Sequence, residues 1–120
     1  MLNLDTHIFL NAVSGRLIDS ERRVLVSDEW GISDIVLWEI EMLYMRGRIG
    51  QGLEHPALAE ALRRVMIWPL TVAICMELRT LDFHSDPADE IIAATSIVEQ
   101  IPLLTRDRVI RRSRMVPFAI

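Results

Sequence analysis

The chain opens with MLNLDTH (residues 1–7), a short apolar run that ends abruptly in an acid and a hydroxyl residue. The run Met1–Leu4 is typical of a buried strand, whose end would deliver Asp5 and Thr6 to the edge of a sheet. Either side chain can cap the helix that the pattern predicts for His7–Val13. The first residues therefore predict a strand that leads directly into a helix, as in α/β folds.

The rest of the chain repeats this alternation of short strands and helices. We predict further strands at Trp30–Ser33, Met66–Leu70, Ile101–Thr105 and Met115–Ile120. We predict further helices at Asp19–Asp28, Ile35–Tyr44, Ala57–Val65, Ala88–Glu99 and Asp107–Arg112, and one that Thr71 caps and that ends between Leu78 and Leu81. This order implies a mostly parallel sheet covered by helices on both faces, in one domain spanning residues 1–120.

The composition excludes several classes of protein. Hydrophobic residues make up 51% of the 120 residues, which is enough for a core without disulfides or a structural metal. Cys75 is the one cysteine and lies in an apolar stretch, so we expect it to be a buried side chain. The sequence contains no apolar run of membrane-spanning length and no recognisable signal peptide. We therefore expect a soluble, cytoplasmic protein that does not contact a membrane.

The basic residues are all arginine, although the net charge is −4. Five of the thirteen arginines lie close together near the C-terminus: Arg106, Arg108, Arg111, Arg112 and Arg114. The negative net charge argues against a broad nucleic-acid-binding surface. The cluster gives weak support for a local phosphate-binding edge, because arginine binds phosphate through two parallel hydrogen bonds. The alternative is a solvated surface in a chain whose gene favours arginine codons.

Two acids follow predicted strands at the point where each strand ends. Asp5 follows Met1–Leu4, and Asp107 follows the strand that ends at Thr105. The carboxyl ends of parallel strands meet at one edge of a sheet, which is where α/β proteins bind ligands. We therefore expect Asp5 and Asp107 to lie close together if their strands are neighbours. Thr6 and Thr105 supply hydroxyl groups that can hold a carboxylate.

Three more acids lie on predicted helices. Glu39 is on the same side of its helix as the apolar Ile35, so it is expected to point into the fold. Asp86 and Asp89 are three residues apart, so they share a face at the start of a helix, where acids are favoured electrostatically. Taken alone, each of these acids has a simpler role as a helix cap or surface residue.

The acids taken together indicate a metal site. Carboxylates gathered in one place repel each other unless a cation neutralises them. Oxygen ligands with nearby hydroxyls suit Mg²⁺ or Mn²⁺, and no spacing of cysteines and histidines suggests zinc. Lone histidines usually pack or face solvent, so we do not expect His7 and His84 to act directly. We expect Trp38 and Trp68 to lie in the core or an interface.

Four segments in order resemble the PIN-domain ribonucleases, and in particular the VapC-like toxins of bacterial toxin–antitoxin pairs. The resemblance covers essentially the whole chain. The segments are LDTH (residues 4–7), SDIVLWEI (residues 33–40), HSDPAD followed by IIAAT (residues 84–89 and 91–95), and PLLTRD (residues 102–107). None is diagnostic alone, but four in this order within 120 residues are fairly specific.

The resemblance implies a three-layer α/β/α fold and a metal-dependent cleavage of RNA. It implies that the catalytic and metal-binding residues are Asp5, Glu39, Asp89 and Asp107, with Mg²⁺ or Mn²⁺ as the cofactor and with Thr6, Asp86 and Thr105 in support. In such a site, water activated by the metal would attack the phosphodiester. The chain departs from the family at Glu90, where a basic residue is common. This extra acid leaves open whether Asp86 or Glu90 joins the site.

The resemblance also implies partners: an RNA substrate, a second copy of the chain in a homodimer, and a cognate antitoxin that wraps an apolar groove and inserts an arginine among the acids. Two other interpretations remain open. A non-catalytic PIN-like scaffold would bind RNA or protein without cleaving RNA. A receiver-like phosphoryl-transfer domain also gathers acids beside Mg²⁺ but needs a lysine, and the chain has none. The sequence does not identify the RNA target.

Overall fold

A computed structural model describes all residues, 1–120, and its elements follow the predicted alternation. The strands are β1 (Leu2–Leu4), β2 (Trp30–Ser33), β3 (Met66–Trp68) and β4 (Leu103–Leu104). The helices are α1 (Thr6–Ser14), α2 (Asp19–Val26), α3 (Ile35–Met45), α4 (Pro56–Arg64), α5 (Val72–Glu77) and α6 (Pro87–Glu99), with two short 3₁₀ helices, η1 (Leu78–Thr80) and η2 (Ile110–Arg112). None of the helices combines the length and apolar character that crossing a membrane requires.

The four strands form one parallel sheet in the order β3-β2-β1-β4. Leu4 pairs with Leu104, so the ends of β1 and β4 lie side by side. The predicted parallel sheet is confirmed, and so is the condition that the strands leading to Asp5 and Asp107 are neighbours. Because all strands point the same way, every strand-to-helix turn opens on one edge of the sheet.

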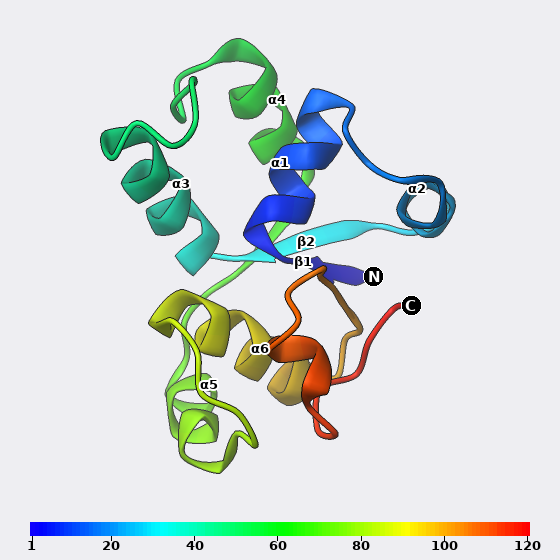
Figure 1. Cartoon of the computed structure of the whole chain (residues 1–120), viewed down its shortest axis with the longest axis vertical. Helices are drawn as coiled ribbons and strands as arrows, with labels where there is room; N and C mark the ends of the chain where they lie inside the picture. Colours follow the sequence, from blue (N-terminus) through cyan, green and yellow to red (C-terminus); the bar gives the residue numbers. More distant parts are fainter.

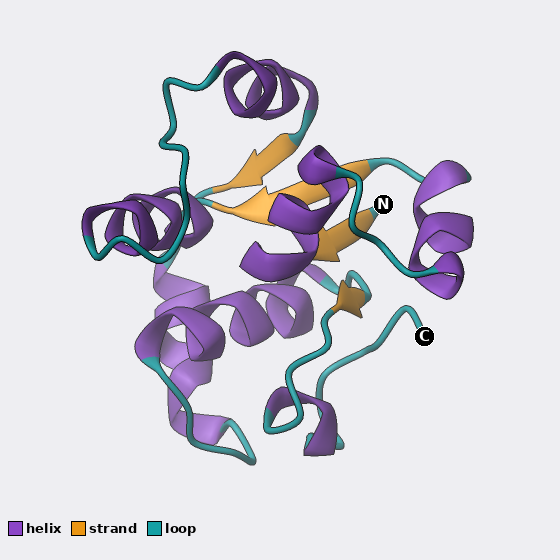
Figure 2. Ribbon diagram, turned by 45° about the horizontal axis from the view of Figure 1, so that its top comes forward, coloured by secondary structure: helices purple, strands orange, loops and turns teal.

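Helices cover the sheet on both sides, as Figure 1 shows. Helices α1 and α4 lie against each other on one side, while α5 and α6 pack together on the other. Helix α3 follows β2 and contacts both α1 and α6. The turned view of Figure 2 shows the sheet between these layers. This arrangement is the three-layer α/β/α fold that the sequence resemblance implied.

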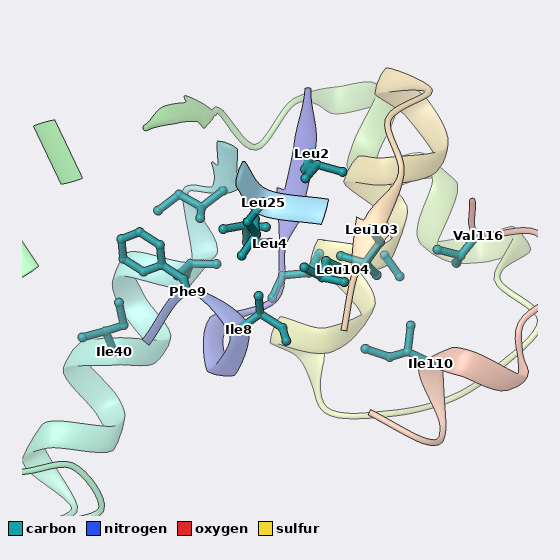
Figure 3. Close-up of a cluster of buried hydrophobic side chains, with 14 of the residues drawn as sticks. Leu2, Leu4, Ile8, Phe9, Leu25, Ile40, Leu103, Leu104, Ile110 and Val116 are labelled. Atoms are coloured by element: carbon teal, nitrogen blue, oxygen red, sulfur yellow. The ribbon is translucent and has the colours of Figure 1, made fainter. Parts of the chain in front are cut away.

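The core lies on both faces of β1 and β4, because the parallel strands are buried on both sides. Leu4, Phe9 and Leu103 are fully buried in it, and Figure 3 shows how these side chains gather around β1 and β4. Each buried leucine or phenylalanine side chain contributes about 1.5–3 kcal/mol to folding. The same packing fixes the strand ends at which the polar residues begin.

One polar residue in the core links β1 to α6. Asn3 is fully buried, and its Nδ2 donates hydrogen bonds to the carbonyl oxygen of Ile92 (3.1 Å) and to Oγ of Ser96 (2.9 Å). Both acceptors lie in the middle of α6. The contact therefore sets the position of α6, whose first turn carries Asp89, relative to the strand that ends at Asp5.

We expect Asn3→Ala to destabilise the protein by about 2 kcal/mol, because it removes two buried hydrogen bonds and leaves a cavity. Unfolding in urea measures this loss. The matched variant Ser96→Ala removes one of the two hydrogen bonds and should cost only about 1 kcal/mol. An unchanged free energy of unfolding in Asn3→Ala would show that this link does not hold α6.

Two sequence predictions were wrong in detail. The expected strand Met115–Ile120 is reduced to a single parallel bridge between Phe118 and Leu103. Pro117, which lacks an N–H group, limits this pairing, although its carbonyl oxygen accepts a hydrogen bond from Leu103. Likewise, Asp107–Arg112 forms a helix only at η2.

The prediction that Cys75 is buried was also wrong. Cys75 is exposed, because the short helix α5 buries only Ile74 and turns its other side chains outward. The apolar stretch around Cys75 thus lies on the protein surface. The two tryptophans differ as well: Trp68 is buried in the core, whereas Trp38 is half exposed.

Candidate metal centre

Three acids from three different elements meet at the carboxyl edge of the sheet. Asp5 directly follows β1, Glu39 lies in the second turn of α3, and Asp89 lies in the first turn of α6. One carboxylate oxygen of each lies within 4.8 Å of the others. Asp5 is almost completely buried, and Glu39 and Asp89 are partly buried. We refer to these three residues as the acid triad.

Threonine hydroxyls hold two carboxylates of the acid triad. Oγ1 of Thr105 donates a 2.6 Å hydrogen bond to Oδ2 of Asp5, across the neighbouring strand ends. Oγ1 of Thr6 donates to Oε1 of Glu39, and the N–H of Thr6 donates to Oδ1 of Asp5 (2.7 Å). Both threonines were predicted as supporting residues from their positions beside the acids. Their hydrogen bonds orient the carboxylates without adding charge.

Ser85 does the same for the third acid and was not predicted. Its Oγ donates a 2.9 Å hydrogen bond to Oδ2 of Asp89. Its N–H donates to Oε2 of Glu90 (3.0 Å), so the Glu90 carboxylate turns back toward the start of α6. Glu90 thus lies outside the acid triad. The sequence does contain a signal for this role, because Ser85 places a hydroxyl group four residues before Asp89. Thr6 and Thr105 likewise lie close in sequence to the acids Asp5 and Asp107.

The charges of the acid triad are unfavourable as they stand. Burial raises the pKa of Asp5 and of Glu39 above their usual values. The pKa of Asp89 is raised to about 6, and burial is the largest cause. The negative charges of Asp5, Asp107 and Asp86 raise this pKa further, whereas the hydrogen bond from Ser85 lowers it. A positive ion among these carboxylates would relieve both effects.

Asp107 lies near the acid triad but is not part of it. Its Oδ1 accepts hydrogen bonds from the N–H groups of Val109 (2.9 Å) and Ile110 (3.0 Å), which caps η2. Its own N–H donates to Oγ1 of Thr105 (3.0 Å), the hydroxyl that holds Asp5. Its charge raises the pKa of Asp89, so the carboxylate is within electrostatic reach. Its role as a fourth ligand stays a prediction.

Asp86 occupies the N-cap position of α6 but makes no capping hydrogen bond with its side chain. It is exposed, and its charge raises the pKa of both Glu39 and Asp89. The structure therefore brings Asp89 and not Asp86 into the acid triad. Asp86 adds an exposed negative charge close to Glu39 and Asp89.

The residues of the acid triad fit a hard divalent cation. All candidate ligand atoms are carboxylate oxygens, and the hydroxyl groups of Thr6, Ser85 and Thr105 donate hydrogen bonds to these carboxylates. Mg²⁺ and Mn²⁺ prefer oxygen ligands and bind through a few carboxylates while keeping several waters. The raised pKa values show that the ionised carboxylates are disfavoured here, mainly by burial and additionally by neighbouring acids, and a cation would favour the ionised form.

Comparison with known proteins gives the family. The sequence profile described as "PIN domain" matches residues 3–114. The chain belongs to the PIN domain family. The match begins within β1 and includes α3, α6 and the turn after β4, so it contains every acid of the candidate site in this PIN domain. No curated protein sequence matches the chain significantly.

Solved structures share the fold of this PIN domain at low sequence identity. A chain in the crystal structure of VapBC2 from Rickettsia felis bound to a promoter DNA fragment is similar, with a TM-score of 0.76, 21% identity, and coverage of 98% of this chain and 97% of that one. A chain in the structure of FitAcB from Neisseria gonorrhoeae matches with a TM-score of 0.66 and 19% identity, over 98% and 96% of the two chains. DNA-bound VapBC from Salmonella typhimurium gives a TM-score of 0.66 and 16% identity, over 98% and 95%.

Two arginines of the C-terminal cluster have structural roles in this PIN domain. Arg106 forms a two-pronged ion pair with Glu21, through Nε (2.7 Å) and Nη2 (2.6 Å). Arg111 donates to the carbonyl oxygens of Thr105 (3.2 Å) and Ile120 (2.7 Å). The predicted phosphate-binding edge is therefore limited to the other three arginines: Arg108, Arg112 and Arg114.

We expect Arg106→Ala to destabilise the protein by about 2 kcal/mol, because it leaves the buried carboxylate of Glu21 without its partner. The cost is at the low end for a broken buried pair, since the Arg106 side chain is 44% exposed. Thermal unfolding measures it. The double variant Glu21→Gln/Arg106→Ala should recover part of the loss. Equal stability of Arg106→Ala and wild type would contradict this role.

Proposed function

We propose that this PIN domain is a metal-dependent endoribonuclease that hydrolyses RNA phosphodiester bonds. The observation that carries the proposal is the acid triad, three carboxylates from three elements at the ligand-binding edge of the sheet. Membership of the PIN domain family supports nuclease chemistry. The raised pKa values support a cation rather than three isolated capping acids.

In this mechanism Asp5, Glu39 and Asp89 would hold Mg²⁺ or Mn²⁺, with Asp107, which follows β4, as a further candidate ligand. When bound, such a cation supplies a water molecule of lowered pKa and neutralises charge that develops on the phosphate. Thr105 keeps the buried Asp5 carboxylate in one orientation. All three acids must be deprotonated, because only an ionised carboxylate binds the metal.

The direct test is incubation of total RNA with the purified protein in Mn²⁺, in Mg²⁺ and in EDTA, followed by mapping of the product ends. We expect defined cleavage in the divalent cations and none in EDTA. Binding of Mn²⁺ without cleavage of any RNA would instead favour a non-catalytic scaffold. Cleavage in EDTA would contradict the metal-dependent mechanism.

We further propose that the protein acts in the cytoplasm as the toxin of a toxin–antitoxin pair. Similarity to chains in the VapBC and FitAcB structures supports this role. An antitoxin needs an apolar surface, and a groove of about 850 Å³ between α1 and α4 offers one, lined by Ala12, Val13, Trp30, Ala61 and Val65. A short neighbouring gene whose product binds this protein and blocks cleavage would support the pairing; a product that binds without effect on cleavage would not.

A homodimer is part of the same proposal. Apolar side chains are exposed on β3 and α5, with Met66 46%, Val72 76% and Met76 51% accessible. Apolar patches of this kind mark protein–protein contacts. Light scattering should therefore give a mass of twice 13.8 kDa. A monomer at all concentrations would remove dimerisation from the proposal without affecting the nuclease.

A further inference from the structure

A second pocket, of about 490 Å³, lies between α1 and the loop that joins α3 to α4. Two of its lining residues are arginines, Arg16 and Arg48, and two are histidines, His7 and His55. No carboxylate lines it, although acids outnumber arginines in the chain. A cavity of this charge in a protein of net charge −4 selects for an anion.

This pocket also has an apolar part. Leu10, Ile49 and Leu58 line it, and Leu58 is nearly completely buried. Asn11 and Gln51 add side-chain amides that can donate and accept hydrogen bonds. Apolar side chains together with exposed arginines suit a nucleotide, whose base and ribose need an apolar contact and whose phosphate needs arginine.

The two arginines of the pocket are available for a ligand. Both are exposed, and neither guanidinium group takes part in an ion pair or hydrogen bond of the protein. Arg16 contributes only its backbone: its N–H donates to the carbonyl oxygen of Asn11 (2.8 Å), and its own carbonyl oxygen accepts a hydrogen bond from Arg106. The side chains of Arg106 and Arg111, by contrast, form hydrogen bonds that stabilise the fold. Arg16 and Arg48 have no such structural role and are free to bind a ligand.

His7 connects the pocket to the acid triad. It lines the pocket from the first turn of α1 and lies two residues after Asp5. Asp5 is the N-cap residue of α1, the same helix that lines one side of the pocket. A strand with one phosphate at the acid triad therefore has its neighbouring nucleotides within reach of the pocket.

We propose that this pocket binds the backbone of single-stranded RNA next to the phosphate that is cleaved, with Arg16 and Arg48 contacting phosphates. The inference rests on the proposed nuclease function. An acidic protein segment is the competing occupant. RNA is favoured because the pocket combines its arginines with apolar and amide side chains, which can contact a base and ribose and which a run of acidic side chains does not need.

The test is binding of a fluorescein-labelled single-stranded RNA of about 12 nucleotides in EDTA, where the proposed chemistry does not proceed. In about 0.1 M KCl, we expect Arg16→Gln/Arg48→Gln to raise Kd about tenfold or more. The slope of log Kd against log [KCl] should fall by about 1.4, the value for two lost phosphate contacts on a single strand. Fluorescence anisotropy measures both quantities.

The matched control is Arg23→Gln/Arg79→Gln, which removes the same charge from two exposed arginines on α2 and η1. We expect its Kd to change less than about twofold and its salt slope to stay the same. Equal weakening in both double variants, or no weakening in Arg16→Gln/Arg48→Gln, overturns the inference. Thermal unfolding should be unchanged in both variants, since no side-chain hydrogen bond is lost.

Two further outcomes separate this inference from the nuclease proposal. The protein could bind RNA through Arg16 and Arg48 and yet cleave no RNA in Mn²⁺. That result would contradict the nuclease proposal and support the pocket as an RNA site. Mn²⁺-dependent cleavage with unaltered RNA binding in the double variant would keep the nuclease and overturn the pocket. A polyglutamate peptide that binds through these arginines more tightly than RNA would also overturn it.

Discussion

Asp5→Asn should slow metal-dependent RNA cleavage by about a thousandfold or more, because it removes the charge of the most buried carboxylate in the acid triad. The substitution preserves the shape of the side chain. Asparagine can still accept a hydrogen bond from the N–H of Thr6, and its amide can donate to the hydroxyl of Thr105. The loss should therefore come from the chemistry and not from unfolding.

The initial rate of cleavage of a labelled RNA in Mn²⁺ measures this effect, with circular dichroism as the check on the fold. Asp19→Asn is the matched control, since Asp19 is 79% exposed on α2 and forms only a surface pair with Arg22. Its rate should equal that of the wild type. An Asp5→Asn protein that is folded and fully active would show that the acid triad is not the catalytic centre.

The second large effect concerns stability. At a concentration 100 times its Kd, a cation that binds only the folded protein adds about 2.7 kcal/mol, or roughly 10 °C in Tm for a chain of this size. We expect this rise with Mn²⁺ near pH 7.5 and a much smaller one near pH 5, where protons compete for the carboxylates. In Asp89→Asn the rise should largely disappear.

The pH dependence follows from the direction of the pKa shifts. The folded state raises the pKa of Asp89 from 3.8 to about 6, so between these values the folded protein holds more protons than the unfolded chain. Stability of the metal-free protein therefore falls as pH rises through this window. The contribution is reduced by solvent, because Asp89 is only partly buried.

Asp89→Asn isolates this contribution from all other titrating groups. In EDTA, its Tm should match that of the wild type near pH 4 and exceed it increasingly up to about pH 7. Thermal unfolding of both proteins across this range measures the difference. A Tm difference that is independent of pH, together with no Mn²⁺ effect on the wild type, would contradict the electrostatics of the acid triad.

The sequence pattern predicted those site residues whose positions follow from where a strand ends or from which face of a helix they occupy. The sequence predicted that Asp5 and Asp107 would meet at one edge of the sheet if their strands were neighbours, and β1 and β4 are neighbours. The structure adds that Thr105, two residues before Asp107, is the residue that holds Asp5. Glu39 was placed by helical spacing, which put it on the side of α3 that faces inward. The resemblance to PIN-domain ribonucleases, which the family match supports, supplied the choice of Asp89.

Other features depend on contacts that spacing does not encode. Asp107 follows its strand as predicted, yet its Oδ1 caps η2 by accepting hydrogen bonds from two N–H groups of that turn. Ser85 holds Asp89 only because the loop before α6 folds back over the first turn of that helix. Cys75 is exposed because α5 buries a single side chain, a packing outcome that its apolar sequence conceals.

The most direct test of the central claim is the position of Mn²⁺ in crystals of the protein, located by anomalous scattering. We predict an anomalous peak bonded to carboxylate oxygens of Asp5, Glu39 and Asp89, and no such peak in Asp5→Asn crystals soaked in the same way. A manganese ion bound elsewhere, with the acid triad empty at a concentration that supports RNA cleavage, would contradict the account.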